Sequence, residues 1–205
     1  MSGSRQRPLL VLGVVAAAAA VLLASVHQWT AAPIAEQAER RAHATLTQLL
    51  PDDSYDNDPI RDRFPAWIAG LEAPSTIHRA RQDGEPAALL ADVTTSEGYS
   101  GPIRLLIALR PNGDVLGVRV LEHRETPGLG DRIERDRSDW ITRFDDRALG
   151  DPPVDDWRPD RRGGAFDTLS SATITSAAVI DAVRRVLAWQ HDNRERIFDI
   201  PSVTE

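Results

Sequence analysis

Hydroxyl side chains are concentrated in one stretch of this 205-residue chain, residues 167–176, which read Asp-Thr-Leu-Ser-Ser-Ala-Thr-Ile-Thr-Ser. A serine or threonine hydroxyl can carry a phosphate-bearing group through an ester bond. The stretch leads into a predicted amphipathic helix, whose buried stripe consists of Val179, Ile180, Val183, Val186 and Leu187. A helix start has unpaired N–H groups and a partial positive charge, so it stabilises a nearby phosphate. We expect Thr175 or Ser176 to cap this helix.

The residue types alone leave two interpretations of residues 167–176. Serine and threonine are the usual helix caps, so the stretch can be an ordinary start of a helix with no ligand. Alternatively, one of its hydroxyls holds a phosphate-bearing cofactor beside the helix N-terminus.

The composition limits the chemistry that the chain can support. There is no cysteine, which excludes disulfides, cysteine-ligated iron–sulfur clusters and c-type haem attachment. The net charge of −7 makes nucleic acid a poor partner. No metal site is predicted, because ligand spacing is missing around the five histidines, which are His27, His43, His78, His123 and His191. We find no nicotinamide fingerprint and no Ser-His-Asp order, so no catalytic residue is predicted.

The N-terminal part contains an uncharged apolar run over residues 9–26, preceded by Arg5 and Arg7. A secretory signal has an apolar part of about 7–15 residues, whereas a membrane-spanning helix needs about 20. The run is longer than a signal requires, and Trp29 suits a membrane interface. We therefore predict a single transmembrane anchor over residues 9–28, with residues 1–8 in the cytoplasm and the rest of the chain outside.

Residues 29–75 are predicted to be a helical linker followed by an acidic loop. Apolar residues recur at helical spacing over residues 31–50, and Pro51 ends the helix. Residues 52–58 are rich in aspartate, without the fixed spacing that a cation site requires.

The middle of the chain predicts an antiparallel meander. Two strands, residues 76–81 and 87–94, flank an Asp-Gly turn signal, and two more, residues 103–109 and 115–121, flank Pro-Asn-Gly-Asp. With the C-terminal helix they give an α+β fold, an antiparallel sheet with flanking helices.

The segments after the meander are predicted from composition. Residues 138–144 should be a short amphipathic segment with Trp140 in the core, and residues 150–160 a surface loop rich in proline and aspartate. The polar tail, residues 193–205, is expected to fray.

A second informative string, His-Arg-Glu-Thr-Pro-Gly-Leu-Gly-Asp, occupies residues 123–131. Its glycines and proline are common in ordinary loops, and they also allow a backbone to approach a flat ligand closely.

Three strings in this order resemble the FMN-binding subunits of the Rnf and Na⁺-translocating NADH:quinone oxidoreductase complexes. They are Gly-Tyr-Ser-Gly-Pro at residues 98–102, Glu-Thr-Pro-Gly-Leu-Gly at 125–130 and Asp-x-x-Ser-x-Ala-Thr at 167–173. The resemblance covers nearly the whole chain, which is identified as a member of the RnfG family, the G subunits of Rnf-type ion-translocating complexes.

The resemblance implies a covalent FMN. Its phosphoester would be carried by Thr173, with Thr175 as the alternative, and a flavin transferase would attach it from FAD. Asp167, Ser170 and Ala172 match the family motif, whereas Ser171 stands where the family usually has glycine.

The resemblance also assigns roles in the second string. Leu129 and the backbone at Gly128 would lie against the flavin ring, and Glu125 and Thr126 would bond near its polar edge.

The implied function is electron relay, with ion movement coupled by neighbouring membrane subunits on a route between ferredoxin and NAD⁺. Residues 76–192 would form a periplasmic FMN-binding domain anchored in the bacterial inner membrane. Two alternatives stay open, the equivalent C subunit of the sodium-pumping quinone reductase and a membrane-anchored assembly module without redox activity.

Overall fold

A computed structural model of the protein describes residues 12–13, 16–17, 20, 22, 25, 45, 49–50 and 53–203. The chain divides into two compact units, Met1–Ala44 and Thr45–Glu205, and the fold described below is that of the second. The expected anchor at residues 9–28 and the expected helix at 31–50 lie largely outside the described residues. Among those that are described, no helix has the length and apolar character needed to cross a membrane.

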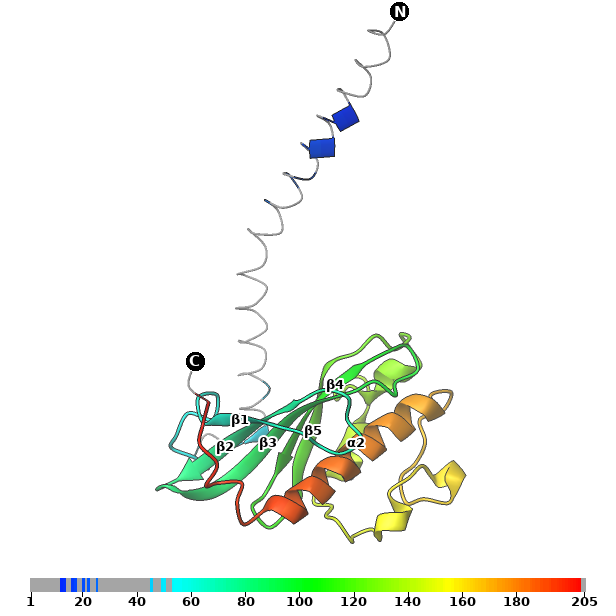
Figure 1. Cartoon of the computed structure of the whole chain (residues 1–205). Coiled ribbons are helices and arrows are strands. Elements are labelled where there is room, and N and C mark those ends of the chain that lie inside the picture. The colour runs from blue at the N-terminus through cyan, green and yellow to red at the C-terminus, as the bar shows by residue number, and fades with distance from the viewer. Residues whose placement is uncertain are drawn as a thin grey trace, which may run out of the picture. The chain divides into compact units, whose positions relative to one another are not determined.

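A five-stranded sheet forms the second unit, and every neighbouring pair of strands is antiparallel (Figure 1). The strands lie in chain order as β1 (Arg63–Ala66), β2 (Ser75–Gln82), β3 (Glu85–Thr95), β4 (Ile103–Leu109) and β5 (Val115–Glu122). The predicted meander is confirmed, with strand ends within two residues of those expected.

Turn residues with a left-handed backbone join the strands. Between β2 and β3, Asp83 and Gly84 have φ values of 53° and 81°, the combination that a two-residue hairpin turn requires. Between β4 and β5, Gly113 has a φ of 102° and its N–H donates to the carbonyl of Arg110 at 2.9 Å. Both turns lie where the sequence signals placed them.

Strand β1 was not expected, and with it the sheet begins before residue 76. It contains Pro65, which pairs with Thr76 of β2. Proline has no N–H to donate, so it is confined to the edge of a sheet, and β1 is the edge strand here.

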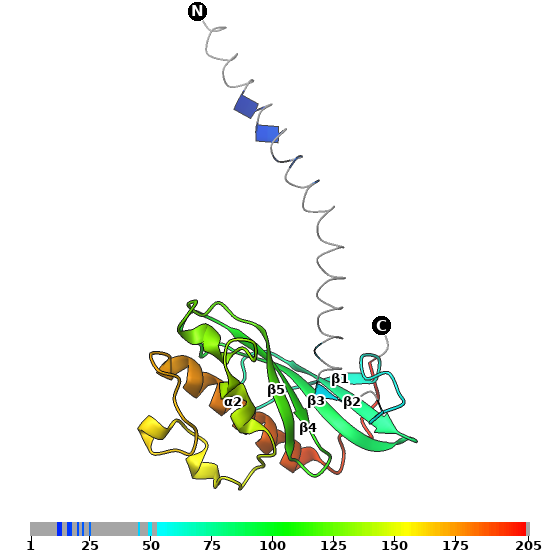
Figure 2. The ribbon, with the colours of Figure 1, turned by 180° about the vertical axis from the view of Figure 1, so that it is seen from behind.

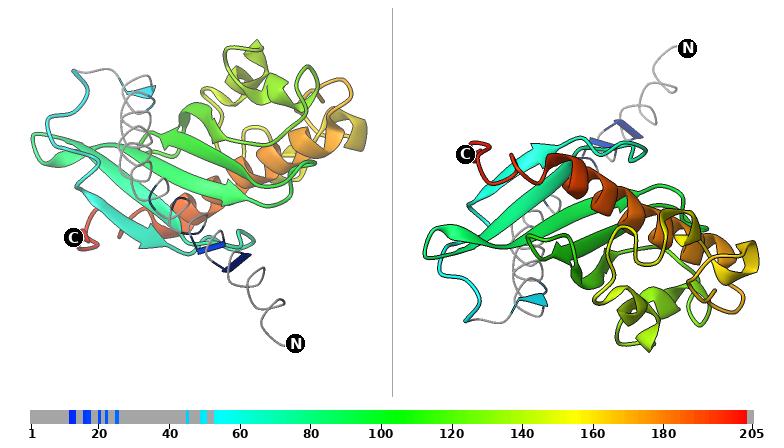
Figure 3. Two further views of the ribbon diagram at one scale, coloured as in Figure 1. Left: turned by 90° about the horizontal axis from the view of Figure 1, so that it is seen from above. Right: turned by 90° about the horizontal axis from the view of Figure 1, so that it is seen from below.

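Helix α2 (Thr173–Asn193) lies along one face of the sheet (Figure 1, Figure 3). The five residues of its predicted stripe are at most 1% exposed. They pack in one core with inward residues of the central strands, among them Leu89, Val93, Leu105 and Ile107. The helix and its buried face are therefore confirmed.

Four short 3₁₀ helices lie between β5 and α2 in the described part of the chain. They are η1 (Gly130–Ile133), η2 (Asp139–Phe144), η3 (Val154–Asp156) and η4 (Asp160–Arg162). Trp140 of η2 is 6% exposed, which confirms it as a core residue. The loop predicted over residues 150–160 is mostly exposed, but it buries Trp157 against Phe144 and Phe166.

The opposite face of the sheet has a smaller apolar cluster. Leu49 and Leu50 are buried there against Leu90 and Leu106, and Tyr55 packs on its margin.

The C-terminal segment is packed on β2, so the expectation that residues 193–205 fray is wrong for the described part (Figure 2). Arg79 of β2 is 1% exposed. It donates to the carbonyls of Ile197 at 3.0 Å and Ile200 at 2.5 Å, and to the hydroxyl of Ser202 at 2.7 Å. A buried guanidinium needs such acceptors, and the tail carbonyls supply them.

Asp62 provides the counter-charge for this arginine. Its carboxylate accepts hydrogen bonds from Arg79 Nε at 2.8 Å, Arg81 Nε at 2.9 Å and Ser202 Oγ at 2.7 Å. Burial alone would raise the pKa of Asp62, but these hydrogen bonds and the charge of Arg79 outweigh it and hold the pKa below its usual value.

We predict that Asp62→Asn lowers the free energy of unfolding at pH 7 by about 3 kcal/mol, because it leaves the buried cation of Arg79 without its counter-charge. A carboxylate whose pKa is depressed in the folded state stabilises the protein at pH values above its unfolded pKa of about 3.9. This contribution to the free energy of unfolding is lost as the pH falls. The difference in the free energy of unfolding between the wild type and Asp62→Asn should therefore shrink below about pH 4. Urea unfolding of the full chain at a series of pH values, followed by tryptophan emission, measures it.

The matched control is Asp146→Asn, since Asp146 pairs with Arg110 at 2.9 Å and its side chain is 79% exposed. An exposed pair contributes at most about 1 kcal/mol. Equal losses in the two variants would contradict the role given to Asp62.

Candidate functional site

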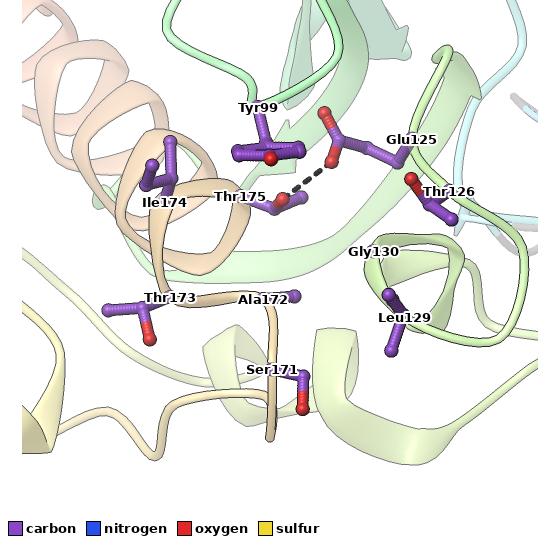
Figure 4. Close-up of a pocket in the computed structure, with 10 residues that line it drawn as sticks. All are labelled: Tyr99, Glu125, Thr126, Leu129, Gly130, Ser171, Ala172, Thr173, Ile174 and Thr175. Carbon is purple, nitrogen blue, oxygen red and sulfur yellow. Dashed lines mark hydrogen bonds between the residues drawn. The ribbon is translucent and has the colours of Figure 1, made fainter.

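A cleft of about 350 Å³ lies where the start of α2 meets two loops (Figure 4). One loop follows β3 and supplies Tyr99, and the other follows β5. The residues that line the cleft are Tyr99, Glu125, Thr126, Leu129, Gly130, Ser171, Ala172, Thr173, Ile174 and Thr175. The fold thus brings together the three strings singled out in the sequence.

The cleft contains most of the predicted site residues but not all of them. Asp167 and Ser170 line a neighbouring polar groove, with Arg132 and Arg143 of the segment around η1 and η2. Gly128 is not among the cleft-lining residues and has a φ of 79° in the loop before η1.

Glu125 is the buried polar group of the cleft, with 5% of its surface exposed. Oε1 accepts the N–H of Ser100 at 3.0 Å, and Oε2 accepts the hydroxyl of Thr175 at 2.6 Å. A Cβ on Gly130 would lie 2.6 Å from Oε2, so the absence of a side chain at residue 130 makes room for the carboxylate. Glu125 thereby connects both loops with α2.

His123 fixes the backbone on which Glu125 is carried. Its Nδ1 accepts the N–H of Glu125 at 2.9 Å, and its Nε2 lies 2.5 Å from Oε1 of Glu134. Because Nδ1 is an acceptor, the proton of this ring is on Nε2 and points at Glu134.

The two threonines at the start of α2 differ in their surroundings. Thr175 is 1% exposed and its hydroxyl donates to Glu125. Thr173 is only partly buried, and its hydroxyl makes no hydrogen bond to any other residue that the structure describes. Of the two, Thr173 has the oxygen that is free to react.

The expectation that Thr175 or Ser176 caps α2 is wrong. The N-cap residue is Ala172, and no side chain caps the first turn. Thr175 is engaged by Glu125, while Ser176 Oγ donates to the carbonyl of Ala172 at 2.9 Å and accepts the N–H of Leu169 at 3.1 Å. The first-turn amides therefore remain without a side-chain acceptor.

The segment before α2 is held in place by side chains on both sides. Trp140 Nε1 donates to the carbonyl of Asp167 at 2.6 Å, and Arg143 pairs with its carboxylate at 2.7 Å. Asp160 accepts both the N–H and the hydroxyl of Thr168, at 2.9 and 2.5 Å. The hydrogen bond from Thr168 lowers the pKa of Asp160, so this acceptor stays ionised.

Ser171 has a left-handed backbone, with a φ of 70°. This conformation carries a steric cost for any residue with a Cβ, and glycine would adopt it without that cost. The serine side chain is exposed, so the cost comes from the backbone alone.

We predict that Ser171→Val lowers the free energy of unfolding by about 1–2 kcal/mol, because a β-branched residue fits the left-handed region poorly. Ser171→Gly should be at least as stable as the parent. Urea unfolding measures both. Ser170→Val is the control, since Ser170 is exposed without a positive φ. If Ser170→Val loses as much unfolding free energy as Ser171→Val, the left-handed backbone at Ser171 is not the cause of the loss.

Four lining residues were not among the predicted site residues: Tyr99, Gly130, Ser171 and Ile174. Gly130, Ser171 and Ile174 lie inside stretches that were singled out, next to residues that were chosen. Tyr99 lies in the recognised string at residues 98–102, to which no role in the site was assigned, and the pairing of the strands brings this loop to the cleft.

Comparisons with known proteins place the cleft within a recognised domain. The profile of the FMN-binding domain family matches residues 98–188, which include every residue lining the cleft, and the profile described as the RnfG N-terminal region matches residues 1–49.

Curated relatives extend over nearly the whole chain. The G subunit of the ion-translocating oxidoreductase complex of Pseudomonas aeruginosa is 43% identical over 199 residues, 95% of this chain and 92% of the relative. The proteins of the same name from Escherichia coli O157:H7 and Shewanella loihica are 37% identical over 197 residues and 35% identical over 198. These alignments cover 96% of both chains for E. coli, and 95% of this chain and 93% of the relative for S. loihica.

Proposed function

Since the chain belongs to the RnfG family, the G subunits of ion-translocating oxidoreductase complexes, we propose that it carries FMN covalently on Thr173 and relays electrons within such a complex. The family predicted from the sequence strings is confirmed, and the FMN-binding domain match supports a flavin-binding subunit. The covalent link, its position and the membrane anchor are parts of the proposal.

The free hydroxyl of Thr173 beside the cleft is the observation that carries this proposal. Its oxygen lacks a partner among the described residues, whereas the hydroxyl of Thr175 is bonded to Glu125. The cleft volume of about 350 Å³ lies within the range of small-molecule sites, about 300–1,000 Å³. Apolar Leu129 and Ile174 with polar Glu125 and Thr126 suit a ring that has one apolar and one polar edge.

Attachment would be a phosphoryl transfer from FAD, catalysed by a flavin transferase. A bond forms between Thr173 Oγ1 and the phosphorus on the flavin side, and the pyrophosphate bond breaks. AMP leaves with the electron pair, and the hydroxyl proton is released. The uncapped first turn of α2 favours the negative charge of the phosphoester next to it.

Bound FMN would supply the redox chemistry, and the protein would supply position and electrostatics. Glu125 and Thr126 would orient the ring through its polar edge, and Leu129 would limit its exposure to water. No separate catalytic site is proposed for this chain.

The apolar run at residues 9–26 and the arginines before it support a single-pass anchor in the inner membrane, with the flavin domain on the periplasmic side. Other membrane subunits of the complex would be its partners. The match of residues 1–49 to the RnfG N-terminal region favours an Rnf-type complex over the sodium-pumping quinone reductase.

Co-expression with a flavin transferase tests the acceptor residue. We expect the wild-type chain to gain the mass of one FMN phosphoester and to fluoresce in a denaturing gel. Thr173→Val should lose both signals completely, because it removes the attacking oxygen and keeps the shape of the side chain. Thr175→Val should keep both, since its hydroxyl is not the acceptor.

Thr175→Val also removes the hydrogen bond to Glu125, which should cost about 1–3 kcal/mol of stability, so its folding is checked by urea unfolding. A signal that persists in Thr173→Val and disappears in folded Thr175→Val would move the acceptor to Thr175. A wild-type chain that stays at its polypeptide mass would instead favour an assembly module without redox activity.

A further inference from the structure

Large apolar side chains are exposed around the cleft. Eight such side chains are exposed in the described part of the chain: Leu12, Leu22, Trp67, Tyr99, Leu129, Val154, Ile174 and Val203. Three of them line this one cleft, with Tyr99 at 69%, Ile174 at 49% and Leu129 at 43%. An apolar rim around a hollow is typical of a ligand site.

The loop that carries Tyr99 is compact and fixed at one end. A Cβ on Gly98 would lie 2.3 Å from the carbonyl oxygen of Gly101, so the loop closes tightly on itself at a glycine. The N–H of Ser100, the residue after Tyr99, donates to the buried carboxylate of Glu125 at 3.0 Å. Tyr99 is therefore held beside the cleft although its ring is exposed.

The ring of Tyr99 and the side chain of Leu129 lie on opposite sides of the cleft (Figure 4). Figure 4 shows the phenol ring edge-on, with a face toward the cleft. A flat ring between them would have an aromatic face on one side and an aliphatic side chain on the other. Aromatic rings gain about 0.5–1.5 kcal/mol from offset stacking beyond the area that they bury.

We propose that Tyr99 is a further binding residue of the cleft, whose ring stacks on the flat ring system of the ligand, and that Glu125 is the positioning residue that holds Tyr99 there through the Ser100 amide. This inference rests on the proposed function, because the ligand is taken to be a flavin. It assigns the outer wall of the site to a residue outside the Glu-Thr-Pro-Gly-Leu-Gly and attachment strings.

The emission of the attached flavin tests the stacking. A phenol in van der Waals contact with an excited flavin quenches it by donating an electron, and a phenyl ring is a much poorer donor. Tyr99→Phe keeps the shape of the wall, so we expect emission to rise several-fold with the FMN mass unchanged. The matched control is Tyr55→Phe, because Tyr55 packs on the opposite face of the sheet, and its emission should equal that of the wild type.

The positioning role of Glu125 has its own pair of variants. Glu125→Ala removes the bonds to Ser100 and Thr175, and we expect brighter flavin emission and easier quenching by iodide. Glu125→Gln keeps an oxygen for the Ser100 amide and a partner for Thr175, so its emission and its iodide quenching should stay close to the wild type.

Intact mass, measured on each sample, separates the two hypotheses. A wild-type chain without FMN would overturn the proposed function. Flavinylated Tyr99→Phe with wild-type emission would overturn the stacking alone. Equal emission of flavinylated Glu125→Ala and wild type would overturn the positioning role and leave the stacking standing.

Discussion

The site depends on one buried carboxylate. Glu125 is almost fully removed from water, and a buried carboxylate is stable only when its oxygens are hydrogen-bonded. One of its partners is a backbone amide after β3, and the other is a hydroxyl in the first turn of α2. Neither bond can be lost without leaving a costly unsatisfied group. This requirement fixes the two loops and the helix start relative to one another and so determines the shape of the cleft.

The same carboxylate separates the roles of two similar residues. Thr173 and Thr175 are two positions apart, and both line the cleft. The bond to Glu125 engages the second hydroxyl, while the left-handed turn at Ser171 brings the chain into α2 with the first hydroxyl unengaged. Upstream, Trp140 and Asp160 hold the segment before the turn. The start of α2 is thus positioned by tertiary contacts, and no side-chain cap contributes.

The regular elements could be predicted from the sequence because their signals are local. Alternation and turn residues located β2 to β5, and the apolar stripe located α2. The cap was predicted wrongly because Thr175 is engaged by Glu125, 50 residues away, and Ser176 by the backbone of Ala172 and Leu169. The packing of the polar tail was missed because it depends on Arg79, a charged residue whose burial no local pattern indicates. Tyr99 was missed because its loop reaches the cleft only through strand pairing.

The exposed rim of the cleft suits a ligand that is attached covalently, as proposed at Thr173. A ligand held by non-covalent contacts alone usually has 70–90% or more of its surface buried, yet the rim residues Tyr99 and Ile174 remain about half exposed or more. A tether at Thr173 would keep the ligand at a high effective concentration beside the cleft, so that weak contacts suffice to orient it. The ring could then keep one edge open to a redox partner. Exposure of the cleft would thus serve electron transfer, and the ester bond at the start of α2 would prevent the loss of the cofactor that such exposure otherwise permits.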